Sequence, residues 1–334
     1  MIINLAPVHE TGVPDLHGPD SPSRLILAAP RGFCAGVVRA IGAVRAALRA
    51  LNPPVYVLKE IVHNARVVED LAAEGAVFAE TLDRVPDGAT LVFSAHGVSP
   101  SVREEATRKH LQIIDATCPL VTKVHLEAVR YARQHYSIIL IGHRDHDEII
   151  GTAGEAPSVT TVVSSVADVD QLELPDPTRA VYLTQTTLSV DDAAEIVARL
   201  RERFPAIEAP SAQDICYATQ NRQDAVKAIA PHVDLLLVVG AHNSSNANRL
   251  VEVAKRAGTR AHLIGDAGDI RPEWLNACRS IGLTAGASTP QVLIDEVTAW
   301  LRARGCERVE EVEVAFENVH FTLPGTGNGE QPCP

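Results

Sequence analysis

Short apolar runs alternate with amphipathic segments along almost the whole chain. Nine apolar runs predict β-strands, at residues 24–29, 55–58, 91–95, 111–116, 137–142, 180–184, 234–240, 261–265 and 281–286. Between them, apolar residues recur at helical spacing in six segments, at residues 64–74, 119–133, 189–203, 218–230, 246–257 and 290–303. Such regular alternation of strand and helix is typical of α/β folds built on mainly parallel sheets.

Three of the six cysteines take the same place in this pattern, between the end of an apolar run and the start of a helix. Cys34 follows RLILAAPRGF, Cys118 follows LQIIDAT, and Cys216 lies in DICYATQNRQDAV. At a helix start, free backbone N–H groups and the helix dipole stabilise a thiolate, the form of cysteine that binds metals. One cysteine in this place is more often a packed residue, but three in matching contexts favour a shared role.

The spacing of these cysteines predicts the domain organisation. They are separated by 84 and 98 residues, about the length of a small domain each, in a chain of 334 residues. A chain of this length suits two or three domains. We predict three α/β domains of similar plan, at residues 24–117, 118–212 and 213–303. Residues 1–23 are predicted to form an N-terminal extension, and residues 304–334 a C-terminal segment and tail.

Polar side chains gather where the predicted strands end, which is where open α/β sheets bind ligands. These residues come from all three predicted domains: His63, His96, His146, Glu148, Thr186, Thr187, Ser244, Ser245, Asn246 and Ser288. Taken one at a time, they are equally explained by helix capping, packing or exposure to solvent. Capping does not explain the matching contexts of the three cysteines, so the joint pattern predicts a metal site surrounded by polar groups.

Composition narrows the possible partners. The chain is 46% hydrophobic, and its formal net charge is −12. This charge argues against nucleic acid or an anionic membrane as the main partner, since both need a basic footprint.

No apolar run approaches the roughly 20 residues that span a bilayer, and the N-terminus lacks the pattern of a secretory signal. We therefore expect a cytoplasmic protein, whose cysteines serve metal binding, catalysis or burial rather than disulfides. Burial or chance explains the remaining three, Cys278, Cys306 and Cys333.

Two kinds of metal site fit three isolated cysteines. Zinc ligands often come in C-x-x-C pairs, which this sequence lacks, although a histidine could complete a zinc site with three cysteines. Iron–sulfur clusters are held by thiolates, and three thiolates on a four-iron cluster leave one iron open as a Lewis acid. The hydroxyl, amide and imidazole groups nearby would suit a phosphate group.

Eight motifs carry a resemblance to a known family. They are PRGFCAGVVRAI, VHN, FSAHGVS, DATCPLVTKVH, TQTTLSVDD, DICYATQNRQ, NSSNANRL and TAGAS. Over roughly residues 24–320 the chain thereby resembles the 4-hydroxy-3-methylbut-2-enyl diphosphate reductases, iron–sulfur enzymes of the last step of the non-mevalonate isoprenoid pathway. The resemblance implies three α/β domains in a pseudo-threefold arrangement around a central 4Fe-4S cluster held by Cys34, Cys118 and Cys216. Loss of the open iron would leave a 3Fe-4S cluster.

The resemblance also implies the reaction and the role of each polar residue. The substrate hydroxyl binds the open iron, and two electrons and two protons remove it as water, giving isopentenyl and dimethylallyl diphosphates. Glu148 matches the proton donor, and Thr186 and His146 complete the catalytic set. The substrate contacts are His63, His96, His146, Thr186, Ser244, Ser245, Asn246 and Ser288. The electrons would come from an external donor of the ferredoxin or flavodoxin type.

One position departs from the family pattern. The family loop reads His-Pro-Glu, whereas this chain has His146, Asp147 and Glu148. Proline fixes its own φ and restricts the residue before it, so Asp147 leaves the loop backbone less constrained. The carboxylate of Asp147 either raises the pKa of Glu148 through like-charge proximity or points to solvent, and the sequence leaves both open.

Two other functions compete with the reductase. A hydro-lyase of the aconitase type would use the same open iron without net electron transfer. Such enzymes usually pair two ligands as C-x-x-C, which this sequence lacks, and they bind carboxylates, which favours arginine side chains. A non-catalytic iron–sulfur or zinc sensor would carry an output surface, such as a basic DNA-reading helix, and the sequence shows none.

Overall fold

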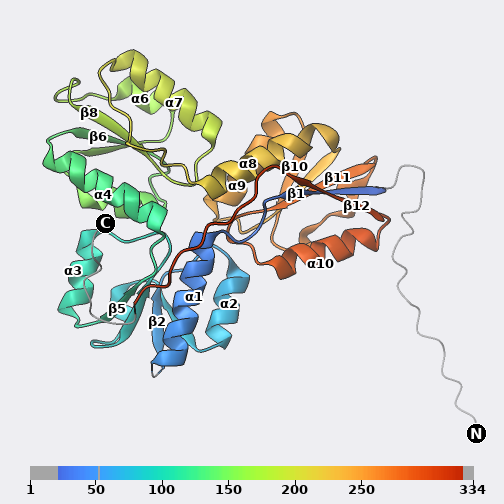
Figure 1. Cartoon of the computed structure of the whole chain (residues 1–334), viewed down its shortest axis with the longest axis horizontal. Coiled ribbons are helices and arrows are strands. Elements are labelled where there is room, and N and C mark those ends of the chain that lie inside the picture. The colour runs from blue at the N-terminus through green and yellow to red at the C-terminus, as the bar shows by residue number, and fades with distance from the viewer. Residues whose placement is uncertain (1–21, 52, 326–334) are drawn as a thin grey trace, which may run out of the picture.

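Three parallel sheets, each in its own lobe, meet at the centre of the molecule (Figure 1). The computed structural model describes residues 22–51 and 53–325. Most of the predicted N-terminal extension, the end of the predicted tail and Cys333 lie outside this range. Within it, the predicted α/β class with three mainly parallel sheets is confirmed.

The first lobe contains a four-stranded sheet with the order β3-β2-β4-β5. The strands are β2 (Val55–Leu58), β3 (Ala76–Ala79), β4 (Thr90–Phe93) and β5 (Gln112–Asp115). Helices α1 (Ala35–Ala50) and α2 (Ala65–Ala73) pack on one face of the sheet, and α3 (Pro100–Arg108) packs on the other.

The second lobe contains a three-stranded sheet with the order β7-β6-β8. The strands are β6 (Ser137–Ile141), β7 (Thr160–Val163) and β8 (Ala180–Thr184). Helices α4 (Pro119–Arg133) and α5 (Asp147–Glu155) cover one face, and α6 (Val166–Gln171) and α7 (Val190–Arg203) cover the other.

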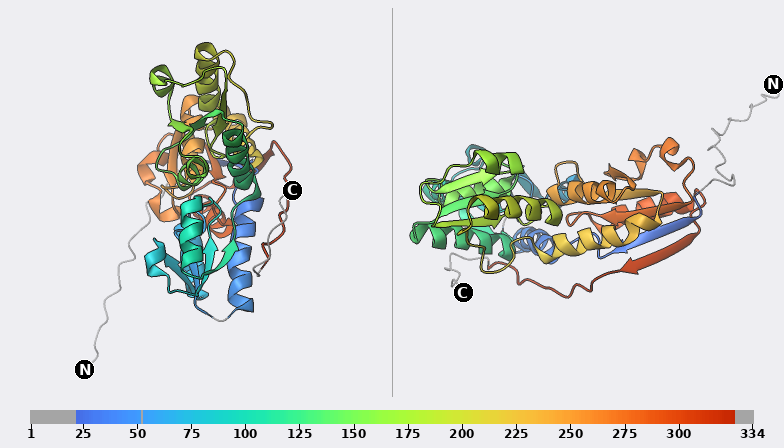
Figure 2. Two further views of the ribbon diagram at one scale, coloured as in Figure 1. Left: turned by 90° about the vertical axis from the view of Figure 1, so that its left-hand side faces the viewer. Right: turned by 90° about the horizontal axis from the view of Figure 1, so that it is seen from above.

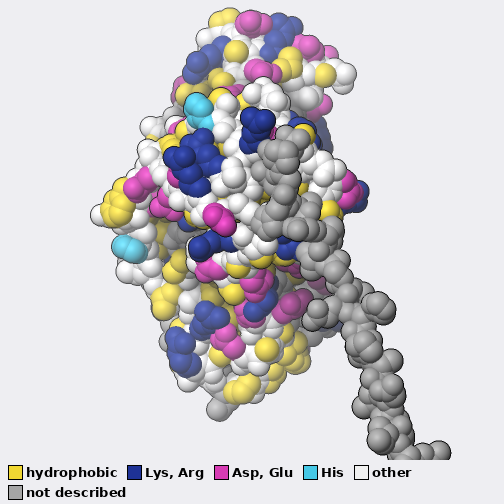
Figure 3. All heavy atoms as spheres, turned by 90° about the vertical axis from the view of Figure 1, so that its right-hand side faces the viewer, with side chains coloured by type: hydrophobic (Ala, Val, Ile, Leu, Met, Phe, Trp, Pro, Cys, Tyr) yellow, Lys and Arg dark blue, Asp and Glu magenta, His cyan; other side chains and the backbone are white. Residues whose placement is uncertain are grey.

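The third lobe contains a five-stranded sheet with the order β10-β9-β11-β1-β12. The strands are β1 (Arg24–Ala29), β9 (Leu235–Val239), β10 (Arg260–Ile264), β11 (Ser280–Ala285) and β12 (Arg308–Glu313). Helices α8 (Tyr217–Ile229) and α9 (Ser245–Arg256) lie on one face, and α10 (Gln291–Arg302) lies on the other. The outer end of this lobe carries basic and acidic side chains interspersed (Figure 3).

Each sheet has a hydrophobic core on both faces, because successive residues of a strand point to opposite sides. In β4, Val92 packs with α1 and α2, whereas Leu91 and Phe93 pack on the side of α3. Strands that are buried on both faces have continuous apolar sequences. This burial explains why the central strands are visible in the sequence.

All nine predicted strands and all six predicted helices are present. Three further strands, β3, β7 and β12, are missing from the sequence-based prediction, and each lies at an edge of its sheet. The strand β12 reads RVEEVE and is buried at no position. Edge position alone does not explain this, since the predicted strands β5, β8 and β10 also lie at edges, but β7 and β12 are mostly not buried and β3 has only four residues.

Strand β1 joins a different sheet from the one that its position in the chain suggests. The predicted first domain begins at residue 24, yet β1 pairs with β11 and β12 of the third lobe. An apolar run predicts a strand without specifying the sheet that it enters. The division at residues 24, 118 and 213 remains our prediction. Strand β1 directly precedes the first lobe in the sequence, but it belongs to the sheet of the third lobe.

After β12 the chain leaves the third lobe, and it has no regular secondary structure from residue 314 to residue 325, where the described part ends. Residues 314–325, which we call the C-terminal strap, run along one side of the molecule toward the first lobe (Figure 2). Leu323 of the strap contacts α1 at Gly42, where a Cβ would lie 2.9 Å from the Leu323 Cδ2. None of the helices in the described part of the chain combines the length and the apolar character required to cross a bilayer.

Candidate active site

The three predicted cysteines line one cavity at the meeting point of the lobes. Each is the residue immediately before a helix: Cys34 precedes α1, Cys118 precedes α4, and Cys216 precedes α8. A Cβ on Gly36 would lie 2.7 Å from the Cys118 Sγ and 3.8 Å from the Cys34 Sγ. Glycine at position 36 therefore allows sulfur atoms from two lobes to approach the same point. None of the three is in a disulfide.

The cysteine group (Cys34, Cys118 and Cys216) has no cationic side chain beside it among the described residues that line the cavity. Burial, together with the neighbouring Cys34, raises the pKa of Cys118 to about 12 and that of Cys216 to about 11. Among the described residues that line the cavity there is no lysine or arginine. Three thiolates brought together in such a cavity need a nearby cation to be stable. The donor set therefore fits a metal group with thiolate ligands.

Glu148 reaches the cavity from α5 and is only 2% exposed. Its carboxyl accepts hydrogen bonds from the backbone N–H of Thr186, at 2.5 Å, and from the Thr186 hydroxyl, at 3.0 Å. Burial raises the pKa of Glu148 to about 7, although these hydrogen bonds oppose the shift. A carboxyl group with this pKa holds a proton near neutral pH and can donate it to a bound molecule.

Three imidazoles, the histidine group (His63, His96 and His146), form a second cluster in the wall of the cavity. The rings of His63 and His96 stack with centroids 4.1 Å apart, and His146 meets both edge-on at 5.4 and 5.7 Å. Burial, with the neighbouring imidazoles, lowers the pKa of His146 to about 4 and that of His96 well below its usual value. His96 and His146 are therefore neutral at pH 7 and form no ion pair with a described carboxylate, whereas the His63 Nδ1 lies 3.1 Å from the Glu60 carboxylate.

Hydroxyl and amide groups from the third lobe complete the wall. Ser244 caps α9, accepting a hydrogen bond from the backbone N–H of Ala247. The Ser288 hydroxyl donates to the carbonyl of His63 at 2.9 Å and so links the third lobe to the first. All twelve predicted site residues line this one cavity: Cys34, His63, His96, Cys118, His146, Glu148, Thr186, Cys216, Ser244, Ser245, Asn246 and Ser288.

The sequence-based prediction misses one residue that lines the cavity beside a cysteine. Thr219 is buried, its Oγ1 lies 3.2 Å from the Cys216 Sγ, and the amide of Asn246 approaches the same hydroxyl at 3.4 Å. The backbone N–H of Thr219 also donates to the Cys216 sulfur at 3.4 Å. The recognised capping-box residue at this position is glutamate or glutamine, so only its place three residues after Cys216 pointed to Thr219.

Asp147 follows neither of the two alternatives that the sequence left open. Its carboxylate forms an ion pair with Lys59 of the first lobe. The charges that act on Glu148 include Asp214 but not Asp147. Ligand atoms of His63, His96 and Asp147 lie within 4.8 Å of one another, close enough to hold a metal ion. Since Asp147 is already paired with Lys59, the cysteine group is the stronger candidate for a resident metal.

Relatives of known activity set the class of the protein. A 4-hydroxy-3-methylbut-2-enyl diphosphate reductase from Leifsonia xyli is 54% identical over 302 residues, which cover 90% of each chain. A 4-hydroxy-3-methylbut-2-enyl diphosphate reductase 1 from Mycobacterium bovis is 55% identical, with 90% of each chain covered. The structure of the E-1-hydroxy-2-methyl-but-2-enyl-4-diphosphate reductase from Plasmodium falciparum superposes with a TM-score of 0.87. It is 44% identical and covers 91% of this chain and 96% of that one.

The fold and these relatives define an α/β oxidoreductase. More particularly, the chain belongs to the LytB protein family, whose model matches residues 25–302. The family includes the reductases that the sequence motifs indicated, so the predicted resemblance is confirmed.

Proposed function

We propose that this protein catalyses the reductive dehydroxylation of (E)-4-hydroxy-3-methylbut-2-enyl diphosphate to isopentenyl and dimethylallyl diphosphates. Two electrons and two protons enter, the allylic carbon–oxygen bond breaks, and the oxygen leaves as water. One observation carries the proposal: a buried carboxyl with a pKa of about 7 shares a cavity with three cysteines and three histidines. The named relatives support the substrate.

The proposed cofactor is a 4Fe-4S cluster held by Cys34, Cys118 and Cys216. When bound, it would supply electrons and a Lewis-acidic iron. An external carrier of the ferredoxin or flavodoxin type would supply the electrons.

In the proposed mechanism, the protein's own residues bind the diphosphate and deliver the proton. The imidazole, hydroxyl and amide groups of the wall donate hydrogen bonds to the diphosphate oxygens. Glu148 holds the proton for the leaving oxygen, because hydroxide is a poor leaving group. Thr186 fixes the carboxyl through its backbone N–H and its hydroxyl, so the proton is presented from one position.

The test is anaerobic reconstitution with iron and sulfide, followed by turnover of the diphosphate substrate with reduced methyl viologen. We expect five-carbon diphosphates from the wild type and a loss of more than about 1,000-fold in Cys118→Ser, since a thiolate ligand is removed. Cys278→Ser is the matched control, because Cys278 is fully buried but lies outside the cavity. A 4Fe-4S spectrum without product would overturn the substrate assignment and favour the hydro-lyase or the sensor.

A further inference from the structure

We propose that Arg222 and Glu317 are positioning residues, which fix the loop of Cys34 against the helix of Cys216. In this role they set how firmly the cluster is retained and the potential at which it is reduced. The proposal rests on the proposed function, because it requires a cluster at the cysteine group. Neither residue lines the cavity.

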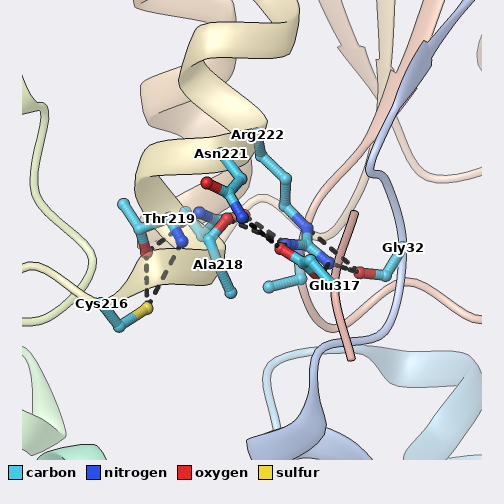
Figure 4. Close-up of polar contacts among 9 residues, drawn as sticks. Gly32, Cys216, Ala218, Thr219, Asn221, Arg222 and Glu317 are labelled. Carbon is cyan, nitrogen blue, oxygen red and sulfur yellow. Dashed lines mark hydrogen bonds and ion pairs between the residues drawn. The ribbon is translucent and has the colours of Figure 1, made fainter. Parts of the chain in front are cut away.

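The guanidinium of Arg222 binds backbone next to two of the proposed ligands (Figure 4). The Arg222 side chain projects from α8 and has no exposed surface. Its Nε and Nη2 donate to the carbonyl of Gly32, at 3.2 and 2.7 Å, two residues before Cys34. Its Nη1 donates to the carbonyl of Ala218, at 2.8 Å, two residues after Cys216. One side chain therefore fixes the separation of two ligand-bearing segments.

Glu317 of the C-terminal strap neutralises this buried cation. Its Oε1 lies 3.0 Å from the Arg222 Nη1, and its Oε2 lies 3.4 Å from the Nη2. The amide of Asn221 donates to the same Oε1 at 3.1 Å. Removing one partner of a buried ion pair leaves an uncompensated charge, which is strongly unfavourable. The position of Arg222 therefore depends on a residue 95 positions later in the chain.

A second buried arginine repeats the arrangement at the third cysteine. Arg39 lies on α1, the helix that Cys34 precedes, and is 7% exposed. Its Nη1 donates to the carbonyl of Thr117, next to Cys118, and its Nε donates to the carbonyl of Thr322 in the strap, both at 2.9 Å. The strap thus contacts two arginines that together reach the segments of all three cysteines. This supports a positioning role for the strap rather than a local contact.

The two partners have opposite expected effects on the cluster. Glu317→Gln leaves the Arg222 charge uncompensated near the cluster, which favours added electrons and moves the reduction potential upward. Arg222→Met removes that cation and moves the potential downward. General loosening of the fold would move both variants in one direction. Arg222→Lys keeps the charge but loses the planar fork that binds Gly32 and Glu317 together.

The experiment compares full-length proteins reconstituted anaerobically: wild type, Arg222→Met, Arg222→Lys, Glu317→Gln and Glu310→Gln. Glu310→Gln is the matched control, because Glu310 on β12 pairs with Arg24 at 2.7 Å, a partly exposed pair away from the cavity. The measurements are the half-life of the cluster absorbance under an iron chelator, the midpoint potential by redox titration, and circular dichroism.

We expect both Arg222 variants to shorten the half-life about 10-fold or more, the usual loss when a group supporting a metal ligand is removed. The control keeps the wild-type half-life and potential. Wild-type values in Arg222→Lys and Glu317→Gln, with normal circular dichroism, would overturn the proposal even if Arg222→Met fails to fold. Potentials that move in the same direction would overturn it as well. A wild type that loads no cluster refutes the proposed function, and this proposal with it.

Discussion

The cysteine group and the histidine group occupy the same cavity, and two members of each have pKa values shifted in opposite directions. Burial raises the pKa of Cys118 and Cys216, and it lowers the pKa of His96 and His146. In both groups the low dielectric disfavours the charged form. No described lysine or arginine lines the cavity beside the thiols, and His96 and His146 form no ion pair with a described carboxylate. This difference shows that the cavity is suited to two occupants of opposite charge.

Asp214 and Glu148, two neighbouring buried carboxyl groups, show a similar contrast between a group with a charged partner and a group without one. Asp214 has a lysine partner, with the Lys123 Nζ 2.7 Å from its carboxylate. Glu148 has hydrogen bonds from Thr186 but no cationic partner within ion-pair distance among the described residues. Burial raises the pKa of both groups, but the Lys123 charge limits the pKa of Asp214 to about 6, whereas that of Glu148 rises to about 7. The position of Glu148 is therefore suited to proton transfer.

The strongest test of this contrast removes the proton from Glu148 but keeps the shape of the side chain. We expect Glu148→Gln to keep the cluster and bind the diphosphate, and to lose about 10²–10⁴-fold in turnover, the usual contribution of a positioned acid. The cluster spectrum and the affinity for inorganic pyrophosphate, both measured on the variant, serve as controls. Equal turnover in the variant and the wild type would refute the role of Glu148.

The histidine group provides the next test, because a bound anion should favour the protonated, positively charged form of its imidazoles. Inorganic pyrophosphate is expected to raise the pKa of His96 and His146, so binding at pH 7 takes up protons. Calorimetry in buffers of different ionisation enthalpy measures this uptake. His96→Gln should weaken pyrophosphate about 10- to 100-fold, as the loss of a hydrogen bond to a charged group does. Binding without proton uptake would place the anion elsewhere.

A smaller effect follows from the pKa of Glu148 itself. The acid must be protonated in the free enzyme, and its pKa is about 7. As the pH rises through that value the protonated fraction falls, so kcat/KM should drop about tenfold for each further pH unit. A pH profile from 6 to 9 measures this slope. Glu148→Gln has no proton to lose there, and its residual activity should lack the descending limb.

Local signals explain which parts of the fold were predictable. The central strands are buried on both faces and are therefore continuous apolar runs, whereas β7 and β12 are mostly not buried and β3 has only four residues. The helix starts at Cys34 and Cys118 depend on a few neighbouring residues, so they could be predicted. The pairing of β1 with the sheet of the third lobe could not be predicted, because it depends on contacts with strands more than 250 residues away, at Ser280 and Arg308.

The same distinction applies to the site. Thr219 lies only three residues after Cys216, so a search of the residues next to each cysteine could have included it. The ion pair between Lys59 and Asp147 joins residues 88 positions apart, and Arg222 meets Glu317 across 95 positions. Neither pair has a local pattern, because each is created by the way the lobes meet. The motifs identified the residues of the cavity, but not the contacts that support them.

The smallest expected effect concerns Asp147, where the family pattern has proline. Asp147 is the first residue of α5, the helix position at which proline is favoured. His146 before it has φ −79° and ψ 136°, the extended conformation that a residue preceding proline adopts. The backbone N–H of Glu148 is held by the His146 Nδ1 at 3.2 Å. The loop therefore has the geometry of a proline loop without the proline.

Asp147→Pro should consequently fold normally and keep kcat/KM within about threefold of the wild type, or roughly 0.7 kcal/mol. Its stability should change by less than about 1 kcal/mol, because the entropy removed from the unfolded chain offsets the lost ion pair with Lys59. Denaturant unfolding of the apo-protein measures this change. Asp147→Asn removes the charge alone, and should be slightly less stable than Asp147→Pro. A large loss of activity in Asp147→Asn would show that the ion pair, and not the capping by His146, holds Glu148 in place.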